Sequence, residues 1–136
     1  TTPEIASKPE FVEYAKNIAM QVAAIVPNYV SEAEVPADVV EHEKKILTEQ
    51  VVDSGKPANV AEKIVEGRMK KFFKEICLLD QPYVKDGDMS VQQYTDATAK
   101  ELGGDIKIKS FVRFEKGEGI EKREDNFADE VANMVK

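Results

Sequence analysis

The chain has 136 residues, 42% of them hydrophobic and 33% charged, with a formal net charge of −7. This composition supports a compact domain with a hydrophobic core and excludes a wholly disordered chain. The acidic balance argues against nucleic acid as the main partner, because phosphate binding needs a concentrated basic surface. No apolar run approaches the roughly 20 residues that span a membrane, and the single cysteine, Cys77, excludes an intramolecular disulfide.

The first half of the chain predicts three helices. Ser7 and Glu10 have the spacing of a capping box, and Pro9 suits a first helical turn. A one-faced apolar pattern then continues to about Val26 through Phe11, Ala15, Ile18, Ala19 and Val22.

Two longer helices follow, over residues 36–79. Pro36 opens one of them, and Gly55 and Pro57 separate it from the next, which runs to about Leu79. Long helices joined by so short a link fold back on each other. We therefore expect an antiparallel helical hairpin that projects from the rest of the domain.

The second half predicts little regular structure. Residues 81–88 are expected to be irregular, whereas Ser90 and Gln93 form a second capping-box pattern before a helix that Gly103 closes. A half-buried strand is predicted where Ile106, Ile108, Val112 and Phe114 alternate with polar residues over much of the stretch. A final helix is predicted over residues 125–136. The fold class is α+β: one domain, 1–136, in which a small antiparallel sheet packs with helices and the hairpin projects.

No set of residues suggests catalysis, a metal or a cofactor. His42 lies on a charged helix between Glu41 and Glu43, without the converging partners that a metal site or general base needs, so we expect a solvated side chain. Cys77 is expected to pack as a small hydrophobe, with an intersubunit contact as the alternative. Gly117 and Gly119 lack the rest of a phosphate-binding motif and indicate a turn.

One feature of the first helix points to a protein contact. Met20 is predicted opposite the apolar face, with Asn17, Gln21 and Ala24 around it. Such a spot is either covered by another part of the domain or reserved for a partner.

Four stretches of the chain together resemble the elongation factor Ts family, in the family's order and over nearly the whole length. They are Asn17–Ala24, Gly55–Phe72 with its Ala61-Glu-Lys-Ile-Val-Glu-Gly-Arg-Met-Lys-Lys-Phe72 run, Cys77–Val84, and Phe111–Lys122 continuing to Val131.

The resemblance implies a protein that binds elongation factor Tu and promotes guanine-nucleotide exchange without bond chemistry, in a bacterial cytoplasm rather than an organelle. It also implies that the first helix and the strand face elongation factor Tu, which makes Asn17, Met20, Gln21, Ala24, Phe111 and Arg113 the candidate contacts. The hairpin is implied in self-association, with Leu47, Phe72 and Ile76 as candidates for a homodimer. The alternative is a dimerisation module with no exchange activity of its own.

Two departures from the family pattern concern the N-terminal side. The family's N-terminal module is absent, and its Thr-Asp-Phe-Val segment falls in the register of Thr2-Pro3-Glu4-Ile5, which offers no aromatic wedge. We therefore expect this chain to be the core subdomain that carries the hairpin. It would be the second of the two related subdomains in a longer protein.

Overall fold

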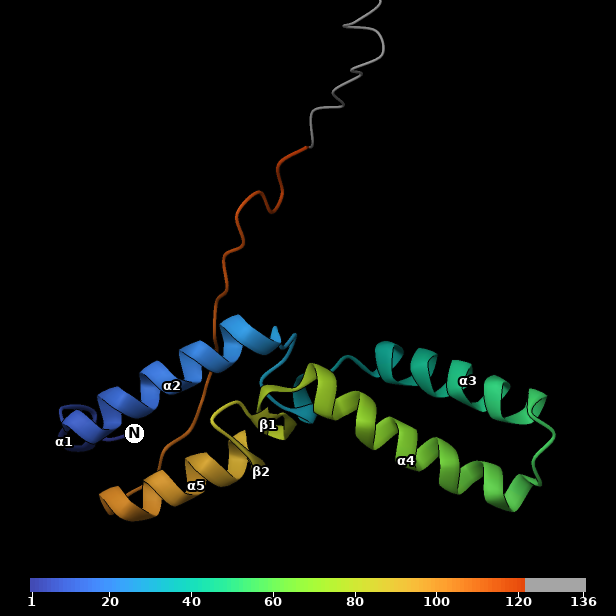
Figure 1. Cartoon of the computed structure of the whole chain (residues 1–136), viewed down its shortest axis with the longest axis horizontal. Helices are drawn as coiled ribbons and strands as arrows, with labels where there is room; N and C mark the ends of the chain where they lie inside the picture. Colours follow the sequence, from blue (N-terminus) through green and yellow to red (C-terminus); the bar gives the residue numbers. More distant parts are fainter. Residues whose placement is uncertain (122–136) are drawn as a thin grey trace, which may run out of the picture.

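A computed structural model describes residues 1–121 of the chain. It consists of a helical body from which a long helical hairpin projects (Figure 1). The body contains α1 (Pro3–Ala6), α2 (Pro9–Ile25), the 3-10 turns η1 (Glu32–Glu34) and η2 (Leu78–Asp80), β1 (Pro82–Tyr83), β2 (Asp86–Ser90) and α5 (Val91–Leu102); the hairpin is α3 (Ala37–Asp53) and α4 (Ala58–Ile76). The predicted class, α+β, is confirmed. The helix predicted over 125–136 lies outside the described residues.

The start of α2 differs from the prediction. Lys8, not Ser7, is its N-cap, and no side chain caps the helix; Pro9 opens it as expected. Ser7 ends the short helix α1 instead, where its hydroxyl donates to the carbonyl of Glu4 at 2.9 Å. The capping-box prediction for Ser7 and Glu10 is therefore wrong, because a four-residue helix that the sequence does not signal takes up the serine.

The core of the body lies between α2, η2 and α5. Its buried members are Tyr14, Ile18, Val22, Leu78 and Val91. The predicted apolar face of α2 is only partly right, since Ala15, Ala19 and Val26 are exposed whereas Tyr14, Asn17 and Gln21 are buried. The buried arc is thus turned toward the side that carries polar residues.

The hairpin prediction is confirmed, and the hairpin has a core of its own. Leu47 and Val51 of α3 pack against Ala61, Val65 and Met69 of α4. Full burial of a valine, leucine or methionine side chain contributes roughly 1.5–3 kcal/mol to the stability of the fold. Gly55, with a φ of 72°, allows the left-handed turn that reverses the chain between the helices.

The sheet of the described residues lies where an irregular segment was expected. β1 and β2 pair antiparallel within 82–90, so the prediction for residues 81–88 is wrong. The capping box that starts α5 is confirmed: Ser90 Oγ accepts from the Gln93 amide at 3.2 Å, and Gln93 Oε1 accepts from the Ser90 amide at 2.9 Å. Gly103 ends α5 with a φ of 74°, as predicted.

The strand predicted from Ile106 to Phe114 does not form among the described residues. Ile106, Ile108 and Phe111 are half-buried against the body's core, whereas Val112 and Phe114 point outward, Phe114 with 92% of its surface exposed. The backbone from 105 to 114 makes no backbone hydrogen bond within the described part of the chain. The alternating side chains therefore hold the segment against the body. It is not a strand, because no neighbouring backbone among the described residues pairs with it.

Candidate protein-interaction surface

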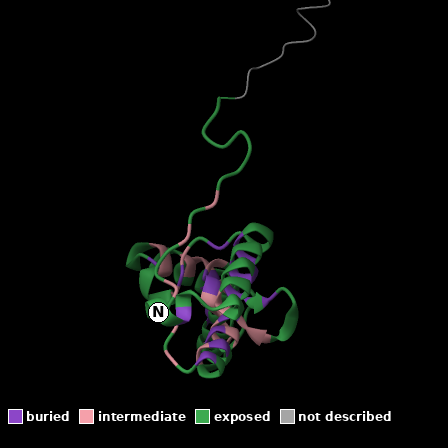
Figure 2. Ribbon diagram, turned by 90° about the vertical axis from the view of Figure 1, so that its left-hand side faces the viewer, coloured by how far each residue is buried: buried purple, intermediate pink, exposed green. Residues whose placement is uncertain are grey.

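The outward face of α2 carries apolar side chains that are exposed to solvent. Met20 is 45% exposed and Val12 44% exposed, and Ala23 and Ala24 beside Met20 are also exposed. Figure 2 shows that buried and exposed residues alternate along the helices. An exposed apolar helix face of this kind is suited to a protein contact.

Two of the predicted contacts do not belong to this face. Asn17 is 6% exposed, and its Nδ2 donates to the Tyr94 hydroxyl of α5 at 2.9 Å. Gln21 is fully buried and bonds to Gln81 and the β1–β2 hairpin. Their predicted placement around Met20 on the outward face is wrong, because both side chains satisfy polar groups inside the body.

Phe111 and Arg113 lie on the segment that follows α5. Phe111 is half-buried against the core that includes Tyr14 and Ile18. The guanidinium of Arg113 pairs with the carboxylate of Glu115 at 2.9 Å, in a partly exposed position. Both residues therefore have partners within the chain, and each still has some exposed surface.

The three hairpin candidates are not equally accessible. Leu47 is buried in the hairpin core, which leaves little of its side chain for a contact with a second copy. Phe72 and Ile76 are half-buried. A shallow groove of about 250 Å³ runs between the helices here, and its floor of Leu47 and Phe72 is bordered by Glu43, Arg68, Lys71 and Glu75.

The two residues considered for chemistry are placed as expected. His42 is exposed on α3. Cys77 is completely buried, and burial, with smaller contributions from Asp80, Glu32 and Glu34, raises the pKa of its thiol to about 11. A thiol held neutral in this way is a poor nucleophile. The turn predicted at Gly117 and Gly119 is also present, with both residues at positive φ.

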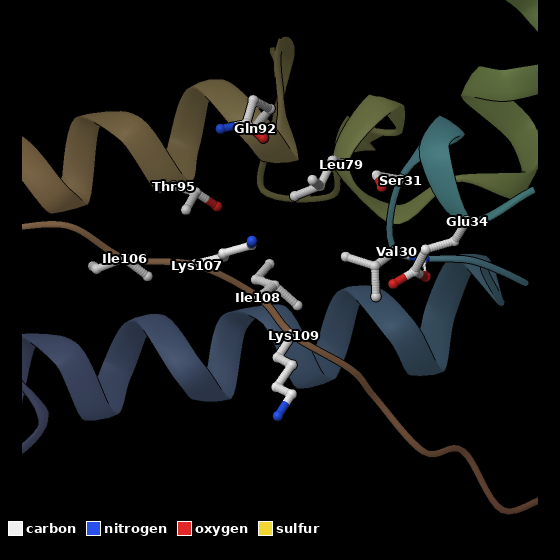
Figure 3. A pocket seen from close by; sticks show the side chains of 10 residues that line it. All are labelled: Val30, Ser31, Glu34, Leu79, Gln92, Thr95, Ile106, Lys107, Ile108 and Lys109. Carbon is white, nitrogen blue, oxygen red and sulfur yellow. Dashed lines mark hydrogen bonds between the residues drawn. The ribbon is translucent and has the colours of Figure 1, made fainter. Parts of the chain in front are cut away.

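A cleft of about 380 Å³ opens between α5, Leu79, the Val30–Glu34 segment and residues 106–109 (Figure 3). Lys107 reaches toward α5, whereas Lys109 points away across α2. The carboxylate of Glu34 accepts from the Val30 amide at 2.9 Å, and the Thr95 hydroxyl is bonded to Tyr14 and to the Val91 carbonyl. These polar groups are thus engaged in holding the fold.

Residues 1–121 were also considered as a metal-binding or membrane-spanning part of the protein. They contain no group of three or more His, Cys, Asp or Glu side chains placed to hold a metal ion. None of their helices combines the length and apolarity required to cross a membrane.

The described residues define a small α+β protein with a projecting helical hairpin and apolar side chains exposed on α2. The chain belongs to the elongation factor Ts family, because the family model described as "Elongation factor TS" matches residues 4–118.

Curated relatives carry the same family name. The chain is 51% identical over 136 residues to Elongation factor Ts of Acetivibrio thermocellus, covering 99% of this chain and 63% of that protein. It is 53% identical over 125 residues to Elongation factor Ts of Clostridioides difficile, covering 92% and 41%. For Carboxydothermus hydrogenoformans the identity is 49% over 135 residues, covering 99% and 62%. The chain therefore spans less than two thirds of the length of these relatives.

Val12 was missed by the sequence reasoning. It lies eight residues before Met20, about two helical turns away on the outward side of α2. The signal was available in the sequence, since Val12, Lys16 and Met20 follow each other at intervals of four.

Proposed function

We propose that this chain binds elongation factor Tu through the outward face of α2. In the full-length protein it would contribute to guanine-nucleotide exchange on that GTPase, without making or breaking a covalent bond. The observation that carries the proposal is the family match over residues 4–118. The bacterial relatives favour a cytoplasmic site of action.

Met20 and Ala24 are the proposed centre of the contact, and Val12 extends it toward the start of α2. These residues offer exposed apolar surface, and methionine is enriched at protein interfaces. Phe111 and Arg113 are proposed at its margin. Asn17 and Gln21 support the helix from beneath and do not touch the partner.

The first test places a charge in the proposed contact. Met20→Asp is expected to weaken binding at least about tenfold, equivalent to roughly 1.4 kcal/mol, because the carboxylate would lose its hydration at the interface. Titration calorimetry of the 136-residue chain with elongation factor Tu measures the change.

Val60→Asp is the matched control for this experiment. Val60 is 42% exposed on α4 of the hairpin, close to the exposure of Met20, and an acidic side chain in the first turn of a helix is favourable. Equal affinities of Met20→Asp and the unchanged chain, with both folded by circular dichroism, would remove α2 from the interface.

Exchange itself needs a second measurement. A factor accelerates exchange only if it binds the nucleotide-free GTPase better than the GDP-bound form. Stopped-flow release of a fluorescent GDP from elongation factor Tu, with and without this chain, separates binding from exchange. Binding without faster release would assign exchange to parts of the protein beyond this segment.

A second candidate function is self-association through the hairpin. Phe72 and Ile76 are both half-buried, and Phe72 lines the shallow groove, whose border carries two acidic and two basic side chains. A surface with both charge signs can complement itself about a two-fold axis. The chain would then act as a dimerisation module.

A further inference from the structure

Two glutamine side chains meet inside the body at the point where the hairpin joins it. Gln21 comes from α2 and Gln81 from the residue after η2, and both have no exposed surface. The Gln21 Nε2 donates to Gln81 Oε1 at 3.2 Å. A buried amide group loses its hydrogen bonds to water, and this costs free energy unless the protein supplies replacement bonds.

Each amide also bonds to backbone on a different element. Gln21 Nε2 donates to the Pro82 carbonyl at 3.0 Å, and Gln21 Oε1 accepts from the Val84 amide at 2.8 Å. Gln81 Nε2 donates to the Glu75 carbonyl at 2.9 Å. That carbonyl lies in the last turn of α4, where carbonyls have no partner within the helix. The pair therefore links α2, β1–β2 and the end of α4.

The backbone bonds at the joint pair residues 28–30 with residues 76–79, and they include the Leu79 amide donating to the Val30 carbonyl at 3.0 Å. The amides of Asn28 and Tyr29 both donate to the Ile76 carbonyl, at 2.8 and 3.1 Å, and the Leu78 amide donates to the Tyr29 carbonyl at 2.8 Å. Figure 1 shows α2 and α4 meeting at this joint and running away from it in opposite directions. These bonds attach the end of α4 to residues 28–30 and not to α2 itself, so a bond that starts from α2 adds a second attachment.

We propose that Gln21 and Gln81 are positioning residues that fix the direction of the hairpin relative to α2. They provide the second attachment, because Gln21 ties α2 itself to the last turn of α4 through Gln81. The amides hold both partners in one hydrogen-bonded geometry, which apolar packing alone does not impose. The consequence for binding rests on the proposed function: a partner on the outward face of α2 meets a hairpin of fixed direction.

Residual dipolar couplings of the weakly aligned 136-residue chain test the direction of the hairpin. In the unchanged chain, the backbone amides of α2 and α4 are expected to fit one alignment tensor. Gln21→Met keeps the volume and removes the bonds, so the tensor fitted to α4 is expected to become smaller than that of α2. Gln81→Met is the second variant and is expected to have the same effect, should Gln21→Met fail to fold.

Val51→Ala is the control for a general loss of stability. Val51 is 1% exposed in the hairpin core, away from the joint. It is expected to lower the stability of the hairpin while α2 and α4 still share one tensor. A single shared tensor in both folded glutamine variants, or the same loosening in Val51→Ala, would overturn the positioning role.

Calorimetry with elongation factor Tu tests the consequence separately. Gln81→Met changes no residue on the outward face of α2, yet it is expected to lower the affinity several-fold if the direction of the hairpin matters. Unchanged affinity with a loosened hairpin would overturn that consequence. Absence of binding by the unchanged chain would instead contradict the proposed function, and the dipolar couplings would still decide the role of the glutamines.

Discussion

Cys77 links the environment of a single residue to the stability of the whole chain. Its thiol is completely buried at the end of α4, and burial raises its pKa from 9.0 to about 11. The unfolded chain therefore releases this proton at lower pH than the folded chain. The stabilising contribution is complete below pH 9 and is lost as the pH rises through about 11.

Comparison with Cys77→Ala isolates this effect from other groups that titrate at high pH. Between pH 9 and 11 the free energy of unfolding of the unchanged chain should fall relative to that of the variant. Urea unfolding at a series of pH values measures both. A difference that stays constant over this interval would mean that the thiol keeps its ordinary pKa in the folded chain.

Asn17 and Gln21 mark the limit of residue-level prediction from the sequence. Apolar periodicity locates the core side of a helix, and it placed Ile18 and Val22 correctly. It assigns polar residues to solvent by default. The partners that make burial possible here, Tyr94 and Gln81, lie 77 and 60 positions away in the chain. Only the folded arrangement reveals them.

At the scale of the element, Gly67 is a weak point in α4. It lies in the middle of a 19-residue helix, it is exposed, and an added methyl group would meet no atom within 4 Å. Gly67→Ala should stabilise the chain by about 0.5–1 kcal/mol, because alanine loses less backbone freedom on folding. Urea unfolding followed by circular dichroism measures the gain.

Gly55→Ala is the contrasting substitution. Its added methyl group would also meet open space, but the residue has a φ of 72°, which is strained for alanine, so the variant should be destabilised by about 1 kcal/mol. If Gly67→Ala lowered stability as well, a close contact on that face of α4, for instance with a second copy, would be the cause.

The long helices of the hairpin and α5, which have local signals, were predicted well, whereas the paired strands were not. The hairpin follows from Pro36, Gly55 and Pro57 and two apolar stripes, all readable within a few turns. β1 and β2 were missed because Pro82 and Gly87 disfavour strands. The strand predicted from Ile106 to Phe114 had the right alternation, but a strand also requires a neighbour to bond to, which alternation does not specify.

At the scale of the molecule, the described residues form two separate hydrophobic cores, one in the body and one in the hairpin. Tyr14, Ile18 and Val91 belong to the core of the body, and Leu47 and Val65 to that of the hairpin. The sequence predicted one domain with a projecting hairpin and did not predict a division into two cores. It could not predict which surfaces remain open, because exposure depends on how the two parts meet at η2 and Gln81.

The separate hairpin makes self-association testable without disturbing the body. If two copies pack groove to groove, Lys71 on the groove's border can lie opposite an acidic residue of the other copy, so Lys71→Glu would create a like-charge contact. Sedimentation equilibrium of the unchanged chain should then show a mass that rises with concentration, and the variant should remain monomeric. Added salt should weaken the unchanged dimer, since exposed ion pairs are screened.

Lys63→Glu is the matched control, because Lys63 is exposed on the same helix but does not border the groove. It makes the same change of net charge and should leave association intact. Equal loss of the dimer in both variants would point to overall charge rather than the groove. A concentration-independent monomer for the unchanged chain would remove the dimerisation function altogether and leave the outward face of α2 as the interaction surface proposed for this part of the protein.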